Sequence, residues 1–393
     1  MQQAKRILYV GTYEREYPRN VTVIAALQGA GYDVCEVHRT VWSASGDKSA
    51  LVSSPHKLIG LGLRCGAAYL SLSWELIRKR NETDLVTFGY IGQLDCIMLG
   101  PLARLMGKPI LFNPLVTLTD TLIDDRMRVA PHGVVARLVR LIDRLSLRLA
   151  STVITDTAQN RDFLETTFGL PRSKVDVVPV GADDLVFRPE PEEERDPAGC
   201  GLRVLFYGNM IPLQGVETIV RAAHLLRDEE DITFDIVGSG QTLDSVRSLA
   251  RTLDVKNVTF SPRLPYEQLP SAIAQSDVLL GIFGDTDKAA RVVPNKVYQA
   301  MAMGAVIITR DSSAAREMLR DGESALLIPP ADPESLAAAI SRMRDAAFRQ
   351  RLGTAARERY LTAASLHVQT AILDRIVTNL LGEPATVRGE VAA

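Results

Sequence analysis

The sequence predicts an α/β protein built from two domains, and three observations support this prediction. The chain has 393 residues, which is long for one domain and comfortable for two. In both halves, short apolar runs alternate with stretches of helical spacing, a pattern typical of parallel sheets covered by helices on both faces. Between the two series lies PEPEEERDPAGCG, residues 189–201, which is rich in proline and acid and indicates a linker.

In the first half we expect strands separated by helices. Each expected strand is a short, largely apolar run, as in strands buried on both faces. The strands are expected at Ile7–Val10, Asp33–Val37, Leu85–Phe88, Ile110–Phe112, Thr152–Thr155 and Val175–Val178. The helices are expected to open at Pro18, to lie around 56–80, to cover Ile91–Met106 and Val134–Ala150, and to follow Asp156.

The second half repeats this alternation and ends in a further helix. Strands are expected at Leu202–Tyr207, Phe234–Val237, Val258–Phe260, Val278–Phe283, Val306–Thr309 and Ala325–Ile328. Two Rossmann-like domains that face each other across a cleft are therefore the predicted architecture. The last helix has an apolar residue at every fourth position from Val368 to Leu380, and Gly382 ends it.

These elements set the expected domain boundaries. The N-terminal domain is expected over 1–188, the linker over 189–201, the C-terminal domain over 202–365, the terminal helix over 366–382 and a tail over 383–393. The N-terminus has only the apolar run Ile7–Val10 after its two basic residues, which is too short for a signal peptide. Leu58–Ile77 has the length of a membrane span, but Arg64 and Glu75 argue against insertion and favour a long helix, buried or lying on an interface.

Composition narrows the function classes. The formal net charge of -2 gives no global attraction to nucleic acid, so an anionic ligand must be met by local cations. The four cysteines are widely scattered and form no CxxC pair, which indicates reduced thiols in the cytoplasm. Neither the cysteines nor the histidines have the spacing of metal ligands, so no metal site is expected.

The segment VVPNKVYQAMAMGAVIITR, residues 292–310, joins a helix start to a buried strand through one glycine. Pro294 fits the first turn of the helix and Gly304 ends it. Asn295 and Lys296 at the helix start offer free backbone amides and one cation, which suit an anionic group. Ordinary α/β packing with a solvated lysine is an equal alternative.

Three motifs in this order carry a resemblance to a known family. PNKVYQAMAMG at 294–304, YGNMIPLQGVETIVRA at 207–222 and VPVGADDLVFRP at 178–189 resemble motifs of the family 4 retaining glycosyltransferases, in the subgroup with PNKxxEAMAMG and IPLQG. The resemblance covers nearly the whole chain. It implies a GT-B fold with an N-terminal acceptor domain, a C-terminal nucleotide-sugar donor domain, and a terminal helix that packs back on the first domain.

The resemblance also implies an activity. A sugar would pass from a UDP- or GDP-linked donor to a hydroxyl of an acceptor glycan, lipid-linked or small, with retention of configuration. No cofactor or metal is expected, because lysine and arginine supply the countercharge and the nucleotide sugar is a cosubstrate. Nucleic acid is not an expected partner.

In parallel sheets, ligands bind beyond the carboxyl ends of strands, so the loops there hold the candidate residues. Gly11 and Thr12 follow the first strand, where a tight strand exit is the alternative to contact with donor or acceptor. The expected donor-binding residues of the second domain are Gly208, Asn209, Gln214, Gly238, Gly240, Arg263, Lys288, Asn295 and Gln299. Gly238-Ser239-Gly240 lacks the third glycine of the dinucleotide fingerprint, which disfavours a nicotinamide dehydrogenase.

Positive charge gathers at Lys288, Arg291 and Lys296. Related enzymes outside the subgroup commonly carry Arg and Lys where this chain has Asn209 and Gln214, so we expect the cluster to replace those cations at the donor diphosphate. Arg291 and Lys296 are the expected catalytic cations.

Three further positions depart from the family pattern. The family's pair of glutamates would fall at Arg291 and Gln299, and neither residue is acidic here; in related enzymes the second glutamate holds the ribose. Arg263 matches a region that holds the base, with a solvent-facing arginine as an equal alternative. The family's histidine at the end of the fourth strand is replaced by Asn113, which we group with the catalytic residues.

Two features of the first domain leave alternatives open. Asp120 begins a group of three acids that could meet acceptor hydroxyls, although such a group is more often a solvated face or a helix cap. Four arginines, at 137, 140, 144 and 148, share one arc of a helix with leucines beside them. A solvated outer face of the helix is favoured by about two to one over the alternative, which is peripheral contact with the inner face of an anionic membrane.

The function expected from these observations is that of a glycosyltransferase. The alternative is a binding or scaffold protein of the same fold that has lost catalysis. It is suggested by Asn209, Gln214, Arg291 and Gln299, which stand at four positions that commonly carry functional charges.

Overall fold

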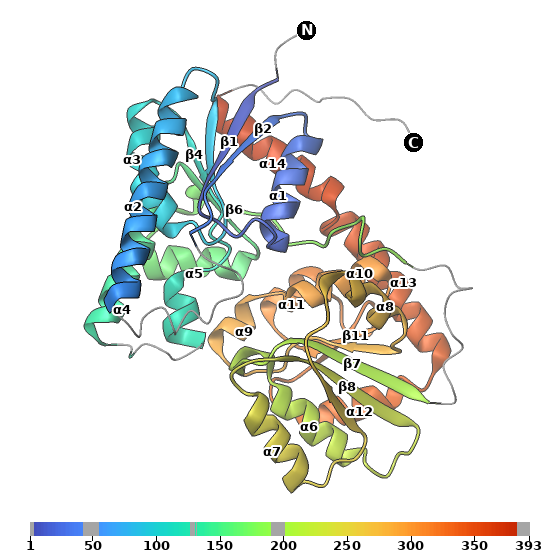
Figure 1. Cartoon of the computed structure of the whole chain (residues 1–393). Helices are drawn as coiled ribbons and strands as arrows, with labels where there is room; N and C mark the ends of the chain where they lie inside the picture. Colours follow the sequence, from blue (N-terminus) through green and yellow to red (C-terminus); the bar gives the residue numbers. More distant parts are fainter. Residues whose placement is uncertain (1–3, 42–54, 126–129, 131, 190–200, 383–393) are drawn as a thin grey trace.

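The computed structural model describes residues 4–41, 55–125, 130, 132–189 and 201–382 (Figure 1). The expected tail lies outside these residues, as does the expected linker apart from its two end residues. The described chain forms two six-stranded parallel sheets, with the orders β2-β1-β3-β4-β5-β6 and β12-β11-β10-β7-β8-β9. The predicted α/β class and the two Rossmann-like domains are confirmed.

The strands lie where the apolar runs predicted them. In the first sheet they are β1 Arg6–Gly11, β2 Asp33–His38, β3 Leu85–Phe88, β4 Ile110–Phe112, β5 Thr152–Thr155 and β6 Val175–Val177. In the second they are β7 Leu202–Asn209, β8 Ile232–Ser239, β9 Val258–Ser261, β10 Val278–Leu280, β11 Ile307–Arg310 and β12 Leu326–Ile328. Strand β10 is shorter than expected. Gly281 and Ile282 still make backbone hydrogen bonds to β11, but the Phe283 N–H donates to the Gln214 carbonyl in the loop after β7.

The helices of the first domain are α1 Pro18–Gly29, α2 Pro55–Arg78, α3 Gln93–Leu105, α4 Val134–Leu149 and α5 Ala158–Phe168, with a π-helical turn, η1, at Asp120–Asp125. Those of the second are α6 Val216–Leu225, α7 Leu243–Thr252, α8 Leu269–Ala274, α9 Asp287–Arg291, α10 Asn295–Met303, α11 Ser313–Met318, α12 Pro333–Arg342 and α13 Ala346–Ala363. The last helix is α14 Leu366–Leu381. Short 3₁₀ turns include η4 at Pro212–Gln214.

Local sequence explains how these helices begin and end. Thr157 accepts a hydrogen bond from the backbone N–H of Asn160 and so caps α5, and Ser365 caps α14 in the same way. Pro294 precedes α10 in an extended conformation, and Gly304 ends the helix with a φ of 67°. A left-handed residue at this place turns the chain out of the helix, so α10 leads directly into β11.

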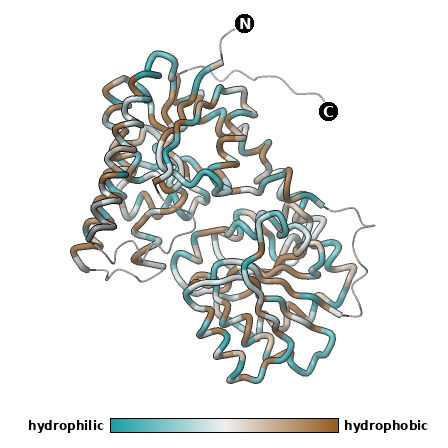
Figure 2. Tube along the Cα trace, viewed as in Figure 1, coloured by the Kyte–Doolittle hydropathy of each residue, from teal (hydrophilic) through white to brown (hydrophobic). Residues whose placement is uncertain are grey.

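Helices cover both faces of the first sheet. Apolar residues of α2, α3, α4 and α5 pack on one face, and those of α1 and α14 pack on the other. The terminal helix therefore lies beside α1, where the Tyr32 hydroxyl donates to Asp374 at 2.7 Å (Figure 1). In the hydropathy view the strands inside both domains are largely brown, as expected for sheets covered on both faces (Figure 2).

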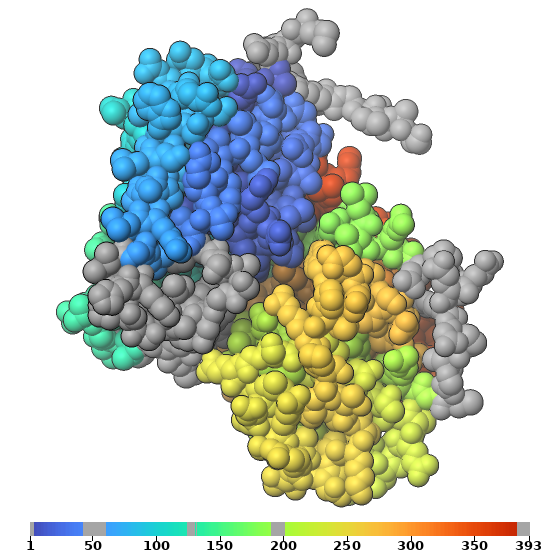
Figure 3. Space-filling model, viewed as in Figure 1, coloured from blue at the N-terminus to red at the C-terminus, as the bar shows by residue number. Residues whose placement is uncertain are grey.

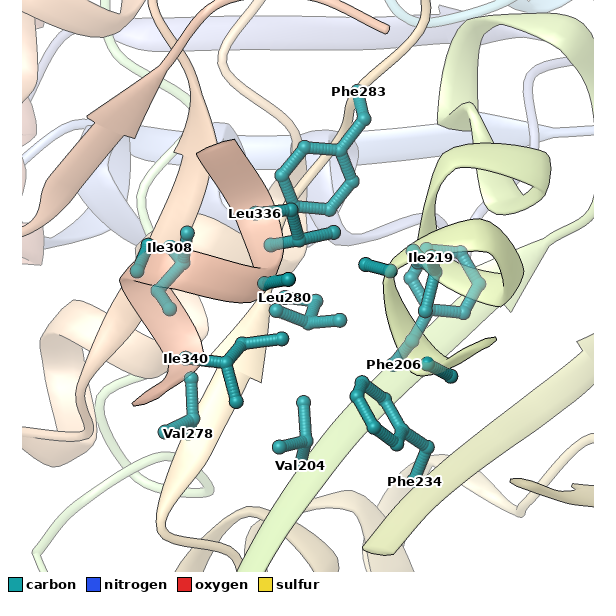
Figure 4. Packing of buried hydrophobic residues seen from close by; sticks show 14 of the residues in the cluster. Val204, Phe206, Ile219, Phe234, Val278, Leu280, Phe283, Ile308, Leu336 and Ile340 are labelled. Atoms are coloured by element: carbon teal, nitrogen blue, oxygen red, sulfur yellow. The ribbon is translucent and has the colours of Figure 1, made fainter. Parts of the chain in front are cut away.

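The second domain has the same layered construction. Figure 4 shows one of its cores, where Phe206 and Phe234 from the sheet meet Ile219 of α6 and Ile340 of α12. The opposite face of the sheet packs against α8, α10, α11 and α13, together with residues of the segment that enters from the first domain. The two domains lie against each other, as the space-filling view shows (Figure 3).

Candidate functional site

Lys296, in the first turn of α10, has a buried ammonium group. Its Nζ donates to Gln214 Oε1 at 2.7 Å and to the carbonyl of Gly281 at 3.2 Å, and lies 3.6 Å from the centre of the Phe206 ring. Only 5% of the residue is exposed, and burial lowers its pKa well below the ordinary value. Within the described residues it forms no ion pair. The site therefore holds a buried cation without an anion.

The loop after β7 surrounds this ammonium. A Cβ at Gly208 would lie 3.3 Å from Lys296 Nζ and 3.6 Å from Gln214 Oε1. Residues 212–214 form the turn η4, and α6 begins directly after Gly215. A helix start presents free N–H groups and a positive dipole end, so backbone amides and one ammonium are brought together at the end of β7. Related enzymes commonly carry a cation at the position of Gln214. Lys296, which we expected to replace that cation, donates a hydrogen bond to Gln214 itself.

The two glycines after β8 are explained by the backbone of this loop. A Cβ at Gly238 would lie 2.0 Å from the carbonyl oxygen of Gly208, and one at Gly240 would lie 2.6 Å from the carbonyl oxygen of Met210. Any side chain here would push the ends of β7 and β8 apart. Asn209 and Arg263 are exposed. For Arg263 this agrees with the alternative of a solvent-facing arginine.

Gln299 lies one turn after Lys296 and is 4% exposed. Its Oε1 accepts a hydrogen bond from the Tyr207 hydroxyl at 2.6 Å. Burial raises the pKa of Tyr207 well above its ordinary value, so this hydroxyl stays a donor. The oxygen expected to meet the ribose is therefore already bonded to a tyrosine that sequence reasoning did not single out.

Lys288 and Arg291, which belong to α9, face the other domain. Arg291 Nη2 lies 2.6 Å from Asp120 Oδ1, and Lys288 Nζ lies 3.3 Å from Asp120 Oδ2. The Arg291 guanidinium also lies over the Phe163 ring at 4.2 Å, and its carbonyl accepts from the Thr157 hydroxyl at 2.6 Å. The Asp120 side chain is only 3% exposed. Asp120 is thus neither on a solvated face nor apart from the cluster; it joins the domains.

The loop after β1 is fixed by Asp95, in the first turn of α3. Asp95 accepts from the Thr12 N–H at 2.8 Å, the Thr12 hydroxyl at 2.9 Å and the Tyr69 hydroxyl at 3.0 Å. A Cβ at Gly11 would lie 2.2 Å from Asp95 Oδ2. Burial raises the pKa of Asp95 to about 6, against the opposing effect of these hydrogen bonds. Sequence reasoning missed Asp95; the only signal was an acid in a first helical turn.

Asn113 directly follows β4. It is fully buried, and its Oδ1 accepts a hydrogen bond from Arg19 Nε at 2.9 Å. Arg19 Nη1 also donates to the carbonyls of Val178 and Pro179, at 2.8 and 2.9 Å. Burial lowers the pKa of this guanidinium. Arg19 was also missed, and it ties α1 and β4 to the segment that leads toward the second domain. Among the described atoms, Asn113 Nδ2 has no hydrogen-bond partner.

Two kinds of feature are absent from the described residues. No group of three or more His, Cys, Asp or Glu side chains could hold a metal ion. No helix in the part of the chain that the structure describes combines the length and the apolar composition required to cross a bilayer.

Comparison with known proteins identifies the class. Residues 201–345, which include the whole second sheet, match the family described as Glycosyl transferases group 1. Together with the two parallel sheets, this match defines a nucleotide-sugar-dependent glycosyltransferase of the GT-B fold. The predicted fold and enzyme class are confirmed.

Particular curated proteins are similar over part of the chain. The GDP-mannose-dependent alpha-(1-6)-phosphatidylinositol monomannoside mannosyltransferase of Mycolicibacterium smegmatis is 26% identical over 281 residues, 67% of this chain and 68% of that protein. The D-inositol 3-phosphate glycosyltransferase of Thermomonospora curvata is 27% identical over 268 residues, 62% of this chain and 59% of that protein. A substantial part of each relative thus lies outside the match.

Solved structures share the fold along almost the whole chain. The sucrose-phosphate synthase of Thermosynechococcus elongatus has a TM-score of 0.71 at 17% identity, covering 96% of this chain and 99% of that one. HepE of Anabaena, in complex with UDP-glucose, has a TM-score of 0.68 at 15% identity, covering 95% of this chain and 99% of that one. At these identities the likeness shows the fold.

Proposed function

We propose that this protein transfers a sugar from a nucleotide-sugar donor to a hydroxyl of an acceptor glycan, with retention of configuration. One observation carries the proposal: the Lys296 ammonium is buried beside the Gly208 loop, and no described carboxylate pairs with it. A buried charge without a partner is unfavourable and is retained where function requires it. The diphosphate of a nucleotide sugar supplies the missing anion.

The chemistry follows from this placement. As the bond between the anomeric carbon and the diphosphate oxygen breaks, negative charge grows on the leaving group, where Lys296 and the amides of the Gly208 loop stabilise it. A bond forms between the anomeric carbon and the acceptor oxygen, and the acceptor proton passes to the departing phosphate oxygen. No described residue has to act as the base, and no metal or cofactor enters the proposal.

The names of similar proteins guide the choice of donors to test. One relative is named for GDP-mannose and one structural neighbour was solved with UDP-glucose, so both nucleotides belong in the test. Gly208, Gln214 and Lys296 are the proposed diphosphate site. Arg263 and Gln299 remain proposed contacts of the nucleoside. Asn209 remains a proposed donor-binding residue, and Asn113 remains a proposed catalytic residue.

A thermal-shift screen with UDP, GDP and their nucleotide sugars tests donor binding. A ligand at about a hundred times its dissociation constant adds roughly 2.7 kcal/mol of stability, which a melting curve resolves easily. Nuclear magnetic resonance of the product then reports the anomeric configuration. A protein that melts at one temperature with every nucleotide contradicts the proposal.

The second candidate is a donor-binding protein without transferase activity. One observation favours it: the Gln299 oxygen is bonded to Tyr207, and Arg291 is bonded to Asp120, so both positions of the usual glutamate pair have other contacts. Labelled nucleotide sugars separate the two functions. Binding accompanied by hydrolysis or transfer supports the enzyme, whereas tight binding without turnover supports this alternative.

A further inference from the structure

The outward face of α2, α3 and α4 is unusually apolar. These three helices pack on the same face of the first sheet, α2 beside α3 and α3 beside α4. Of the seventeen large apolar side chains recorded as exposed in the described part of the chain, twelve lie on them. Single exposed apolar residues need no explanation, but a concentration of this kind on one face indicates a binding surface. We call the outward side of these helices the lateral face.

Helix α2 contributes an apolar stripe at helical spacing. Leu63, Leu70 and Trp74 are 72%, 75% and 66% exposed, and Ile77 continues the row at 39%. Leu72 and Leu76, on the opposite side of the same helix, are fully buried against the sheet. The core therefore accounts for Leu72 and Leu76 but not for the exposed apolar side chains of α2. In Figure 2, hydrophobic colour recurs along the helices at the left edge of this domain.

Helix α4 adds apolar and positively charged residues to the same face. Val134, Leu138 and Leu141 are 80%, 55% and 49% exposed. Arg144 and Arg148 are exposed as well, one turn apart, and Arg137 is exposed one turn from Leu141. Basic residues beside exposed leucines on one helix are typical of helices that lie in a membrane interface.

The acidic side chains of these three helices are either buried or paired with an arginine. Asp95 of α3 is buried and bonded to Thr12, and Asp143 of α4 is buried and bonded to Thr119. Glu75 of α2 is held by Arg78 at 2.8 Å. In the described part of the three helices no other acid occurs, so the lateral face is positive as well as apolar.

We propose that the lateral face binds the surface of an anionic lipid bilayer. Its leucines and Trp74 would enter the boundary between headgroups and acyl chains, and the arginines of α4 would contact lipid phosphates. Charge complementarity favours this partner, because lipid phosphates would meet the exposed guanidinium groups of Arg137, Arg144 and Arg148. The inference is independent of the donor site, since no residue of the lateral face belongs to that site.

The test uses the full chain and vesicles at low salt. Wild-type protein should sediment with vesicles that contain phosphatidylglycerol and remain in solution with phosphatidylcholine alone. The double variant Arg144→Glu/Arg148→Glu should bind at least about tenfold more weakly. The matched control is Arg247→Glu/Arg251→Glu, which reverses two exposed arginines with the same spacing on α7 of the second domain and should bind as wild type does.

A second variant tests the apolar half of the surface. Leu70→Ser/Trp74→Ser should also lose vesicle binding, while its melting temperature and its thermal response to nucleotides stay those of the wild type. In Trp42→Phe, which leaves Trp74 as the one tryptophan of the chain, fluorescence should shift to the blue when anionic vesicles are added. Wild-type protein that ignores anionic vesicles at low salt overturns the proposal. So does self-association through this face, seen by analytical ultracentrifugation and abolished by Leu70→Ser/Trp74→Ser.

Discussion

Arg291 and Lys296 lie five residues apart, and the structure gives them opposite surroundings. Arg291 points toward the first domain, where it contacts the Asp120 carboxylate and the Phe163 ring. Lys296 turns into the second domain, where it meets an amide oxygen, a backbone carbonyl and the face of a phenylalanine. One cation pairs with an anion of the protein, whereas the other has no anion among the residues that the structure describes.

The sequence grouped Lys288, Arg291 and Lys296 as one cluster, but their different surroundings indicate different roles. A paired guanidinium stabilises the contact between domains, because both charges of the pair are satisfied when the domains meet. An unpaired ammonium is unfavourable until an anionic ligand arrives. Binding of the donor diphosphate therefore depends mainly on Lys296, whereas Lys288 and Arg291 stabilise the contact between the two domains. The predictions below test this division.

The largest effect is expected at the domain contact. Asp120→Asn removes the carboxylate that pairs with the nearly buried Arg291 and also contacts Lys288, which should lower the free energy of unfolding by about 3 kcal/mol. Urea unfolding measures the loss, and small-angle X-ray scattering should show a larger radius of gyration as the domains separate. Asp311→Asn, which breaks an exposed pair with Arg316, is the control and should cost less than about 1 kcal/mol. Equal losses in the two variants contradict this role of Asp120.

The next effect is expected at the donor site. Lys296→Met should weaken nucleotide binding by roughly 1.5–3 kcal/mol, about 10- to 150-fold, because a charge-assisted contact is lost. The same variant should melt higher than the wild type, because a buried unpaired charge is removed; each 1 kcal/mol is worth about 2–4 °C in a protein or domain of 150–250 residues. Lys256→Met, which removes an exposed lysine of the same domain, should change neither property.

The free energy of unfolding should also depend on pH through Lys296. Burial lowers the folded-state pKa of this lysine, so between that value and about 10.4 the unfolded chain binds more protons than the folded one. Stability from this residue should therefore rise with pH across that window. Lys296→Met should flatten the rise, which urea unfolding at several pH values measures. A wild-type rise that persists in the variant must come from another group.

The smallest effect is expected at Gln299. Gln299→Glu should tighten nucleotide binding a few-fold, because a carboxylate keeps the bond from Tyr207 and offers a second, charged acceptor to a ribose hydroxyl. Repulsion from the diphosphate opposes the gain, and Lys296 reduces it. Tyr207→Phe is the companion variant, since it frees the existing oxygen without adding charge. A large loss of affinity in stably folded Gln299→Glu would show that this subsite no longer meets the ribose.

The sequence predicted most of the fold and part of the site, and the reason lies in the range of the interactions. Every expected strand is present, because an apolar run between turn residues is a local signal. Lys296 at a helix start, Gly304 at its end and the glycine loop after β7 are local signals too. The apolar length of α2 was also visible, together with the expectation that it is buried or lies on an interface.

What could not be predicted depends on residues far apart in the chain. Asp120 and Arg291 are separated by 171 residues, and Thr12 and Asp95 by 83. No periodicity or motif reports that such side chains meet. The sequence therefore showed three neighbouring cations, and only the folded chain shows that two of them have a carboxylate from the other domain.

The most direct test of this account is the proton linkage of nucleotide binding. Isothermal titration of UDP and GDP, in two buffers of different ionisation enthalpy, reports protons taken up on binding. Because burial lowers the pKa of free Lys296 and a diphosphate raises it again, the wild type should take up a proton at alkaline pH, and affinity should fall as pH rises further. Lys288→Met should keep this uptake, and Lys296→Met should lose it together with most of the affinity. Unchanged affinity and proton uptake in Lys296→Met would contradict the assignment of Lys296 to the donor diphosphate.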